Sequence, residues 1–140
     1  MESKNIADLL AQHCHDKKGE NVVILDLQKH SSVADYFVIC SGFSDRQVSA
    51  IADSAMDELK KAGATHCRAE GIRDGRWALV DFGSVILHVF LDSLRDYYNL
   101  EGLWHDAPRT RIRDTDGDPN DNDERDTYKP SDFEPGHARF

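Results

Sequence analysis

The sequence predicts an α+β fold: one mixed β-sheet of about five strands with helices packed on it. Two observations lead to this prediction. Stretches with the 3.6-residue apolar period of a helix alternate with short apolar stretches typical of strands along residues 1–105. The resulting order, α-β-β-α-β-β-β-α, suits a single layered domain, and 140 residues with 39% hydrophobic side chains suffice for one core.

The first helix is expected to run from a possible N-cap at Ser3 to a stop at Gly19. Its buried stripe has helical spacing and consists of Ile6, Leu9, Leu10, His13 and Cys14. Two strands follow at residues 21–27 and 34–40, where the apolar stretches NVVILDL and ADYFVIC flank the polar segment QKHSS.

A second helix is predicted from Ser44, because Gln47 three residues later completes a capping box. Its apolar stripe consists of Val48, Ile51, Ala52, Ala55 and Leu59. Gly63 ends this helix, and residues 65–71 are expected to form a short or edge strand.

Residues 76–82 and 84–90 are the predicted strands of a hairpin around Gly83. With a turn centred between Gly83 and Ser84, Leu79 lies opposite His88, and side chains alternate across the ribbon. One face is wholly apolar and contains Ala78, Val80, Phe82, Val85, Leu87 and Val89. The other face is mixed and contains Trp77, Leu79, Asp81, Ile86, His88 and Phe90. The first face therefore belongs to the core.

Asp81 and His88 are diagonal neighbours on the mixed face, and three interpretations are open. They can form a structural hydrogen bond beneath a helix. A catalytic couple would need a nucleophile or a third polar group, and no GxSxG motif stands nearby. The third interpretation is a surface that docks a partner, since interface cores are enriched in aromatic side chains.

The last helix is predicted to begin at Asp92 or Ser93 and to continue through about Trp104. Its apolar side chains are Leu94, Tyr97, Tyr98, Leu100, Leu103 and Trp104. So wide an aromatic arc presents more apolar surface than one small sheet needs to cover. This favours the docking interpretation, with a sheet edge or a second copy of the chain as the alternative cover.

Composition divides the chain near residue 105, which gives a domain at 1–105 and an acidic tail at 106–140. Residues 114–126 hold seven carboxylates in thirteen positions and no large apolar side chain, so the tail is expected to be disordered. The whole chain has 17 basic and 26 acidic side chains, a net charge of −9. This charge disfavours direct binding to nucleic acid and suits a basic protein partner.

No cofactor, metal or membrane span is predicted. No run of 18 apolar residues occurs, no signal peptide is visible, and three widely spaced cysteines are typical of a reduced, cytoplasmic protein. The segment CSGFSDRQ at 40–47 lacks both glycine-rich phosphate-binding patterns, and an ordinary N-cap explains it. The strand carboxylates Asp26, Asp35 and Asp81 never form the DxD pair that nucleotidyl transfer uses.

The motifs DLQKHSSVADYFVICSGFSDRQVSAIADSAMDELKKAG, EG, WALVDFGSVILHVF and YYNLEGLW occur in this order along about residues 3–105. Together they resemble the ribosomal silencing factor family, also called the RsfS or Iojap family. The resemblance implies a nucleotidyltransferase-like fold without the catalytic carboxylates. It also implies a binding protein rather than an enzyme.

The resemblance implies attachment to the fourteenth protein of the large ribosomal subunit, on the face that meets the small subunit. Occupation of that face would block subunit association and repress translation under nutrient limitation. A homodimer is implied for the free chain. The alternatives are a nucleotide-binding, nucleotidyltransferase-like enzyme that uses Gly42 and Ser44, and a large-subunit assembly factor that uses the same docking surface.

The expected docking surface follows from the residues that match the family's strand-pair and terminal-helix motifs. These residues are Trp77, Asp81, His88, Arg95, Tyr98, Leu100, Glu101, Leu103 and Trp104. Trp77, Tyr98 and Trp104 are the expected apolar anchors. Asp81, Asp96 and Glu101 are expected to pair with basic side chains of the ribosomal protein.

Overall fold

A computed structural model describes residues 2–112 of the chain. Its elements in chain order are α1 (Ser3–Asp16), β1 (Glu20–Asp26), β2 (Tyr36–Gly42), α2 (Asp45–Lys61), β3 (Arg68–Glu70), β4 (Trp77–Asp81), β5 (Val85–Leu91), α3 (Asp92–Tyr98), α4 (Leu100–Leu103) and β6 (Arg109–Arg111). Most of the predicted acidic tail, from residue 113 onward, lies outside the described residues.

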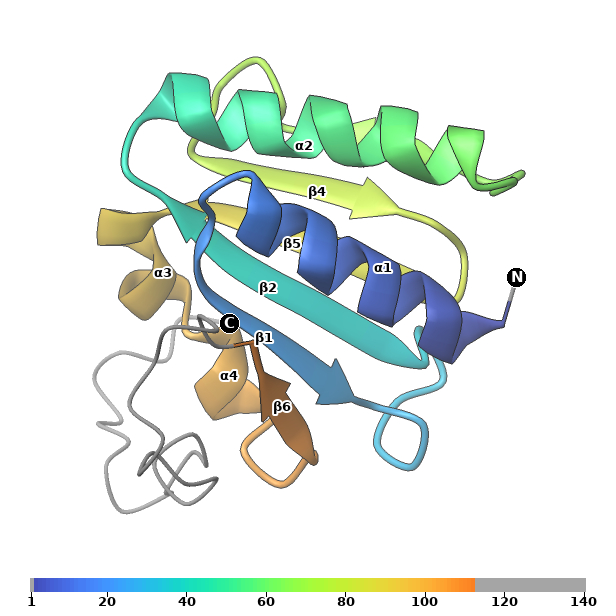
Figure 1. Cartoon of the computed structure of the whole chain (residues 1–140). Coiled ribbons are helices and arrows are strands. Elements are labelled where there is room, and N and C mark those ends of the chain that lie inside the picture. The colour runs from blue at the N-terminus through green and yellow to red at the C-terminus, as the bar shows by residue number, and fades with distance from the viewer. Residues whose placement is uncertain (1, 113–140) are drawn as a thin grey trace, which may run out of the picture.

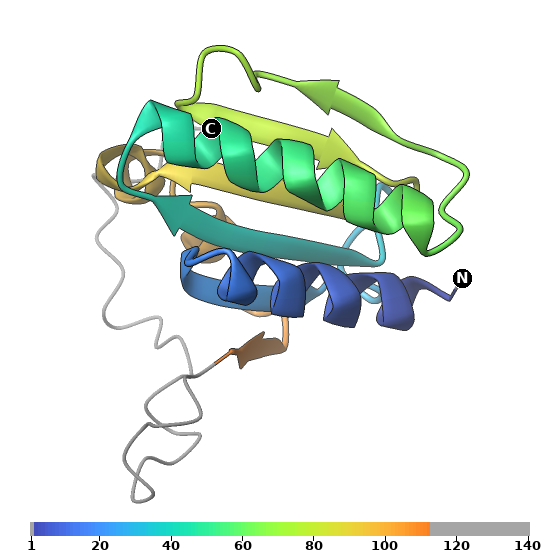
Figure 2. The same cartoon turned by 45° about the horizontal axis from the view of Figure 1, so that its top comes forward.

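The strands form one mixed sheet in the order β3-β4-β5-β2-β1-β6. β2 and β5 pair in parallel, and the other neighbouring pairs are antiparallel. α1 and α2 lie side by side on one face of the sheet, and α3 and α4 lie behind the other (Figures 1 and 2). β2, in the middle of the sheet, is buried along its whole length, because both faces are covered. The predicted α+β class is therefore confirmed.

The sheet has six strands rather than about five, and the sixth lies in the segment predicted as tail. β6 pairs with β1 through the register Val23 with Arg111 and Leu25 with Arg109. The backbone N–H of Ile112 continues this pairing by donating to the carbonyl of Val22. β6 is held by backbone hydrogen bonds while its own side chains are polar, so no apolar pattern in the sequence marks it.

The two long helices begin differently, and only one of the two predicted N-caps is present. Ser3 does not cap α1, because its hydroxyl donates to Asp35 across 2.7 Å instead. At α2 half of the predicted capping box is confirmed, since the Ser44 hydroxyl accepts from the Gln47 N–H at 3.1 Å, but the return bond goes to the residue before the cap. The Gln47 side-chain oxygen accepts from the Phe43 N–H.

The single last helix that the sequence predicts is broken at Asn99. This residue has left-handed backbone angles, φ 47° and ψ 54°, which asparagine tolerates better than most residues. Its side chain accepts from the Gly102 N–H at 3.1 Å and so caps the start of α4. The chain therefore turns between α3 and α4. Within residues 2–112, no helix combines the length and the apolar character needed to cross a bilayer.

The hairpin register is confirmed, with Leu79 opposite His88 and Asp81 opposite Ile86. The wholly apolar face of this hairpin joins the cluster beneath α1 and α2. The mixed face joins a second buried cluster, which consists of Val23, Leu25, Leu27, Ala34, Phe37, Ile39, Ile86, Phe90, Leu100 and Ala107. The short α3 and α4 and the connecting segments that carry Leu27, Ala34 and Ala107 pack on this second cluster, and aromatic side chains at its margin stay half-buried.

Candidate docking surface

Six ring side chains gather where β2, β4 and β5 meet α3 and α4. We call this set the aromatic face; its members are Phe37, Trp77, His88, Phe90, Tyr98 and Trp104. Strand pairing places the first group, because Trp77 lies opposite Phe90 and Phe37 lies beside Ile86 in the parallel pair. The helices add Tyr98 and Trp104 from the far end of the sequence. The structure thus brings together residues that lie up to 67 positions apart.

Trp77 is the centre of the aromatic face. Its indole stacks on Phe90 with ring centroids 4.9 Å apart and lies 4.6 Å from the Tyr98 ring. Its Nε1–H donates to Nδ1 of His88 at 3.1 Å. The indole thus makes stacking and hydrogen-bond contacts within the chain, while the residue remains half-buried.

His88 is buried, with 4% of its surface exposed. Because an indole N–H can only donate, Nδ1 must be the unprotonated nitrogen and Nε2 must carry the ring hydrogen. Nε2 is buried and has no hydrogen-bond partner among the described residues, although the Phe37 ring lies 4.5 Å away, centroid to centroid. Burial lowers the pKa of His88 from 6.5 to about 3. The imidazole is therefore neutral at physiological pH.

Asp81 is separate from the aromatic face. Its carboxylate accepts from the Gly83 N–H at 2.7 Å, within the hairpin turn. The Asp81–His88 hydrogen bond considered from the sequence does not form, because His88 takes its hydrogen bond from Trp77. Asp81 lies four residues along β4 from Trp77, about 13 Å at strand spacing. It belongs to the opposite end of the strand.

Arg95 and Glu101 form a buried ion pair. Nε of Arg95 donates to Oε1 of Glu101 at 2.9 Å, and the two side chains are 7% and 17% exposed. The sequence predicts that Glu101 pairs with a basic residue of the partner protein. In the structure its charge already has a partner within the chain, and contact of either residue with another protein stays a prediction.

The helix ends provide exposed apolar side chains beside the aromatic face. Leu103 is 47% exposed, whereas Leu100 is buried and belongs to the core. Trp104 is half-buried, with its ring edge-to-face against Phe37 at 6.3 Å. Tyr97 was not among the predicted site residues, yet it is 51% exposed and packs edge-to-face on Tyr98. The paired tyrosines of the YYNLEGLW motif were the signal for it.

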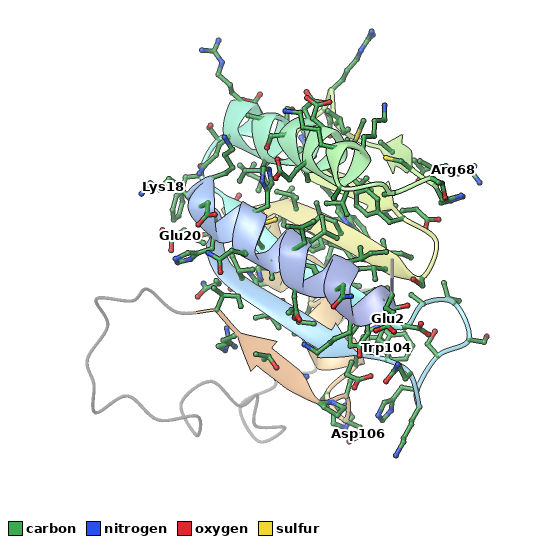
Figure 3. The ribbon with its side chains drawn as sticks, turned by 45° about the vertical axis from the view of Figure 1, so that its right-hand side comes forward. Glu2, Lys18, Glu20, Arg68, Trp104 and Asp106 are labelled. Carbon is green, nitrogen blue, oxygen red and sulfur yellow. The ribbon has the colours of Figure 1, made fainter. Side chains whose placement is uncertain are left out.

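Three exposed carboxylates lie on the elements that adjoin this region. Asp92 and Asp96 are exposed on α3, and Asp106 is exposed after α4. Figure 3 shows Asp106 beside β6 and Arg68 at the opposite edge of the sheet. Exposed carboxylates next to an apolar centre are complementary to a basic protein. Among residues 2–112, no group of three or more His, Cys, Asp or Glu side chains is placed to hold a metal.

Several known proteins similar to this chain are described as ribosomal silencing factors. The family described as "Ribosomal silencing factor during starvation" matches residues 1–136. Ribosomal silencing factor RsfS of Bacillus subtilis is 47% identical over 108 residues, which cover 77% of this chain and 92% of that protein. The chain belongs to the ribosomal silencing factor family.

Two solved structures resemble this member of the ribosomal silencing factor family. A protein of Chromobacterium violaceum has a TM-score of 0.72 and 40% identity, over 74% of this chain and 87% of that one. A protein of Bacillus halodurans has a TM-score of 0.68 and 38% identity, over 78% of this chain and 99% of that one. A more distant relative, the mouse "Mitochondrial assembly of ribosomal large subunit protein 1", is 30% identical over 100 residues, 44% of the mouse protein.

Proposed function

We propose that this protein is a ribosome-binding regulator that docks on the large subunit and blocks its association with the small subunit. The docking surface consists of the exposed side chains Tyr97 and Leu103 together with the half-buried Trp77, Tyr98 and Trp104. By occupying the face that meets the small subunit, the protein represses translation under nutrient limitation. It works by excluded volume, as a binding protein without a cofactor and not as an enzyme.

One observation carries the proposal beyond family membership. Two of the large hydrophobic side chains exposed on the described part of the chain, Tyr97 and Leu103, lie on α3 and α4 next to the aromatic face. Exposed apolar groups beside stacked rings are typical of protein-docking sites. The acidic net charge favours a basic ribosomal protein over RNA phosphate as the direct contact.

The finer parts of the proposal come from the family resemblance. The partner is the fourteenth protein of the large subunit, the free chain is a homodimer, and the location is the cytoplasm. Homodimerisation would use some apolar surface, so binding to the ribosome and self-association can be compared by sedimentation at several concentrations. A dimer that persists on the large subunit would exclude the aromatic face as the dimer contact.

Leu103→Glu tests the docking surface. A carboxylate at this exposed position should leave the fold intact and raise the Kd for large subunits by at least about tenfold, because hot-spot side chains lie near interface centres. Ala50→Glu adds the same charge at an exposed position of α2, on the opposite face of the sheet. Co-sedimentation with purified large subunits measures both variants, and the yield of joined ribosomes measures the consequence.

Equal binding by Leu103→Glu and by the unmodified chain would refute this surface. Failure of the unmodified chain to co-sediment would refute the ribosome as target. Calorimetric titration with magnesium and nucleoside triphosphates tests the enzyme alternative, for which Gly42 and Ser44 were the candidate residues. Clear nucleotide binding there would favour the enzyme.

A second candidate function is assembly of the large subunit. The name of the mouse relative refers to assembly of the mitochondrial large subunit. The same docking surface would serve both roles. Profiling of large-subunit precursors in cells that lack the protein separates them, because accumulation of precursors during growth without starvation indicates assembly.

A further inference from the structure

α3 and α4 present the exposed side chains, yet both helices are short. α3 has seven residues and α4 has four, whereas an isolated helix needs about 12–15 residues to be even marginally stable in water. Tertiary contacts must therefore fix their position. The buried residue of α3 is not apolar: it is Arg95, 6% exposed.

The Arg95 guanidinium connects four elements. Nε donates to Glu101 in α4, and one terminal nitrogen donates to the Ser41 hydroxyl at the end of β2, at 3.1 Å. The same nitrogen lies 3.3 Å from the Glu20 carbonyl at the start of β1. At this point β1 bulges, because its register with β2 shifts between Glu20 and Val23. Arg95 therefore satisfies a carbonyl at a place where the ladder is irregular.

The direction of these bonds fixes the orientation of α3 and α4. The guanidinium is planar and its donors point along fixed directions, so it specifies angle as well as distance. Tyr97 and Tyr98 follow Arg95 by two and three residues, and Leu103 follows Glu101 by two. Any rotation of α3 against α4 would therefore move the exposed apolar side chains relative to the sheet.

We propose that Arg95 and Glu101 are positioning residues of the docking surface. Their ion pair holds the segment 92–104 in the orientation at which Tyr97 and Leu103 meet the large subunit, and neither charge contacts the partner. This inference rests on the proposed function. It reassigns two residues that the family resemblance places among the partner contacts.

Burial and neighbouring charges support the positioning role. The two side chains are 7% and 17% exposed, so little of either is left for a partner to contact. The exposed carboxylates of Asp92 and Asp96 on α3 are available for that purpose instead. A buried pair that loses one member leaves an uncompensated charge, which displaces the surrounding structure.

The test compares Glu101→Gln and Arg95→Met with Arg46→Met, a control that removes an exposed arginine on α2. Binding to purified large subunits is measured at low and high salt. Each test variant should raise the Kd by about tenfold or more, by the same factor at both salt concentrations, because no charge–charge contact with the partner is lost. The double variant should bind no more weakly than the worse single variant, since both act through one contact.

A direct contact gives the opposite pattern. If Glu101 touched a basic partner, Glu101→Gln would lower the salt dependence of binding, and its effect would add to that of Arg95→Met. Either result, or unchanged binding by both variants, would overturn the positioning role. Arg95→Lys retains a charge for Glu101 without the planar donors. Its Kd for the large subunit should lie between those of the unmodified chain and Arg95→Met. It replaces Arg95→Met in the test if the Met variant is too unstable to measure.

A ribosome-free measurement separates this inference from the proposed function. The Trp77 and Tyr98 ring centroids are 4.6 Å apart, so we expect a near-ultraviolet circular dichroism signal that depends on the position of α3. Glu101→Gln and Arg95→Lys should change this signal while the far-ultraviolet spectrum stays that of the unmodified chain. Unchanged near-ultraviolet spectra refute positioning. If the unmodified chain does not bind the large subunit, the proposed function is refuted, but the positioning of α3 and α4 by Arg95 and Glu101 is not.

Discussion

Trp77 and His88 show how one hydrogen bond determines the chemistry of a residue. The indole N–H requires an unprotonated Nδ1, and burial disfavours the charged ring, so both effects hold His88 neutral. A buried imidazole whose Nδ1 already accepts a hydrogen bond has no free acceptor nitrogen with which to take a proton as a general base. The contacts of His88 on the mixed face are those of packing within the chain.

The lowered pKa of His88 makes stability depend on pH. The folded pKa is about 3 and the ordinary value is 6.5, so between these values the unfolded chain binds a proton that the folded chain does not. Stability is full above pH 6.5 and falls as the pH is lowered, by about 1.5 kcal/mol between pH 6.5 and 5. His88→Gln should remove this part of the dependence. Urea unfolding at pH 6.5 and pH 5 measures the free energy of unfolding of both proteins. If the variant lost as much stability between the two pH values as the unmodified chain, His88 would not be the group responsible.

The sequence could place Trp77 and His88 on one face because side chains alternate along strands. It could not identify their hydrogen bond. Trp77 and Asp81 both lie two residues along β4 from Leu79, the residue opposite His88, so both are equally good candidates from the register alone. The choice depends on the direction of the indole edge, and that direction is set by stacking on Phe90 and Tyr98. Tyr98 comes from a different element, so the hairpin alone does not contain the information.

At the scale of elements, the turn at Asn99 shows a break in a helix that the apolar periodicity of the sequence does not predict. Leu94, Tyr98 and Glu101 have helical spacing across it, so periodicity alone extends one helix to Trp104. The break comes from a single residue that both adopts the left-handed conformation and caps α4. β6 escaped prediction for a related reason: its position depends on backbone pairing with β1 and not on its own side chains.

Substitution of Asn99 tests this account of the turn. Asn99→Ala places a β-carbon in the left-handed region and removes the cap on the Gly102 N–H, so it should cost about 1–2 kcal/mol of unfolding free energy. Asn99→Gly loses the side-chain cap but adopts the backbone angles freely, so its cost should be only a few tenths of a kcal/mol. Urea denaturation measures both, and equal losses would show that the backbone angle is not what matters there.

At the scale of the whole molecule, charge and shape have different roles. The net charge of −9 acts over a Debye length and reflects the whole sequence, whereas the exposed side chains Tyr97 and Leu103 are local to α3 and α4. Composition alone led to the expectation of a basic partner, which stays a prediction, whereas motif order predicted the family, which the comparisons confirm. The location of the exposed side chains needed the fold, because the two tyrosines of α3 differ in exposure although they are adjacent.

This division predicts how salt affects binding to the large subunit. Raising the ionic strength from roughly 50 to 300 mM should slow association severalfold and change dissociation little, since long-range charges steer encounter while buried apolar contacts set residence time. Asp92→Asn combined with Asp96→Asn should reduce this salt dependence, because both exposed carboxylates lie beside the docking surface. Stopped-flow mixing with labelled large subunits measures the rates. An association rate that rises with salt would mean that the acidic chain is repelled by its target, as it would be by RNA phosphate, and would exclude a basic protein as the first contact.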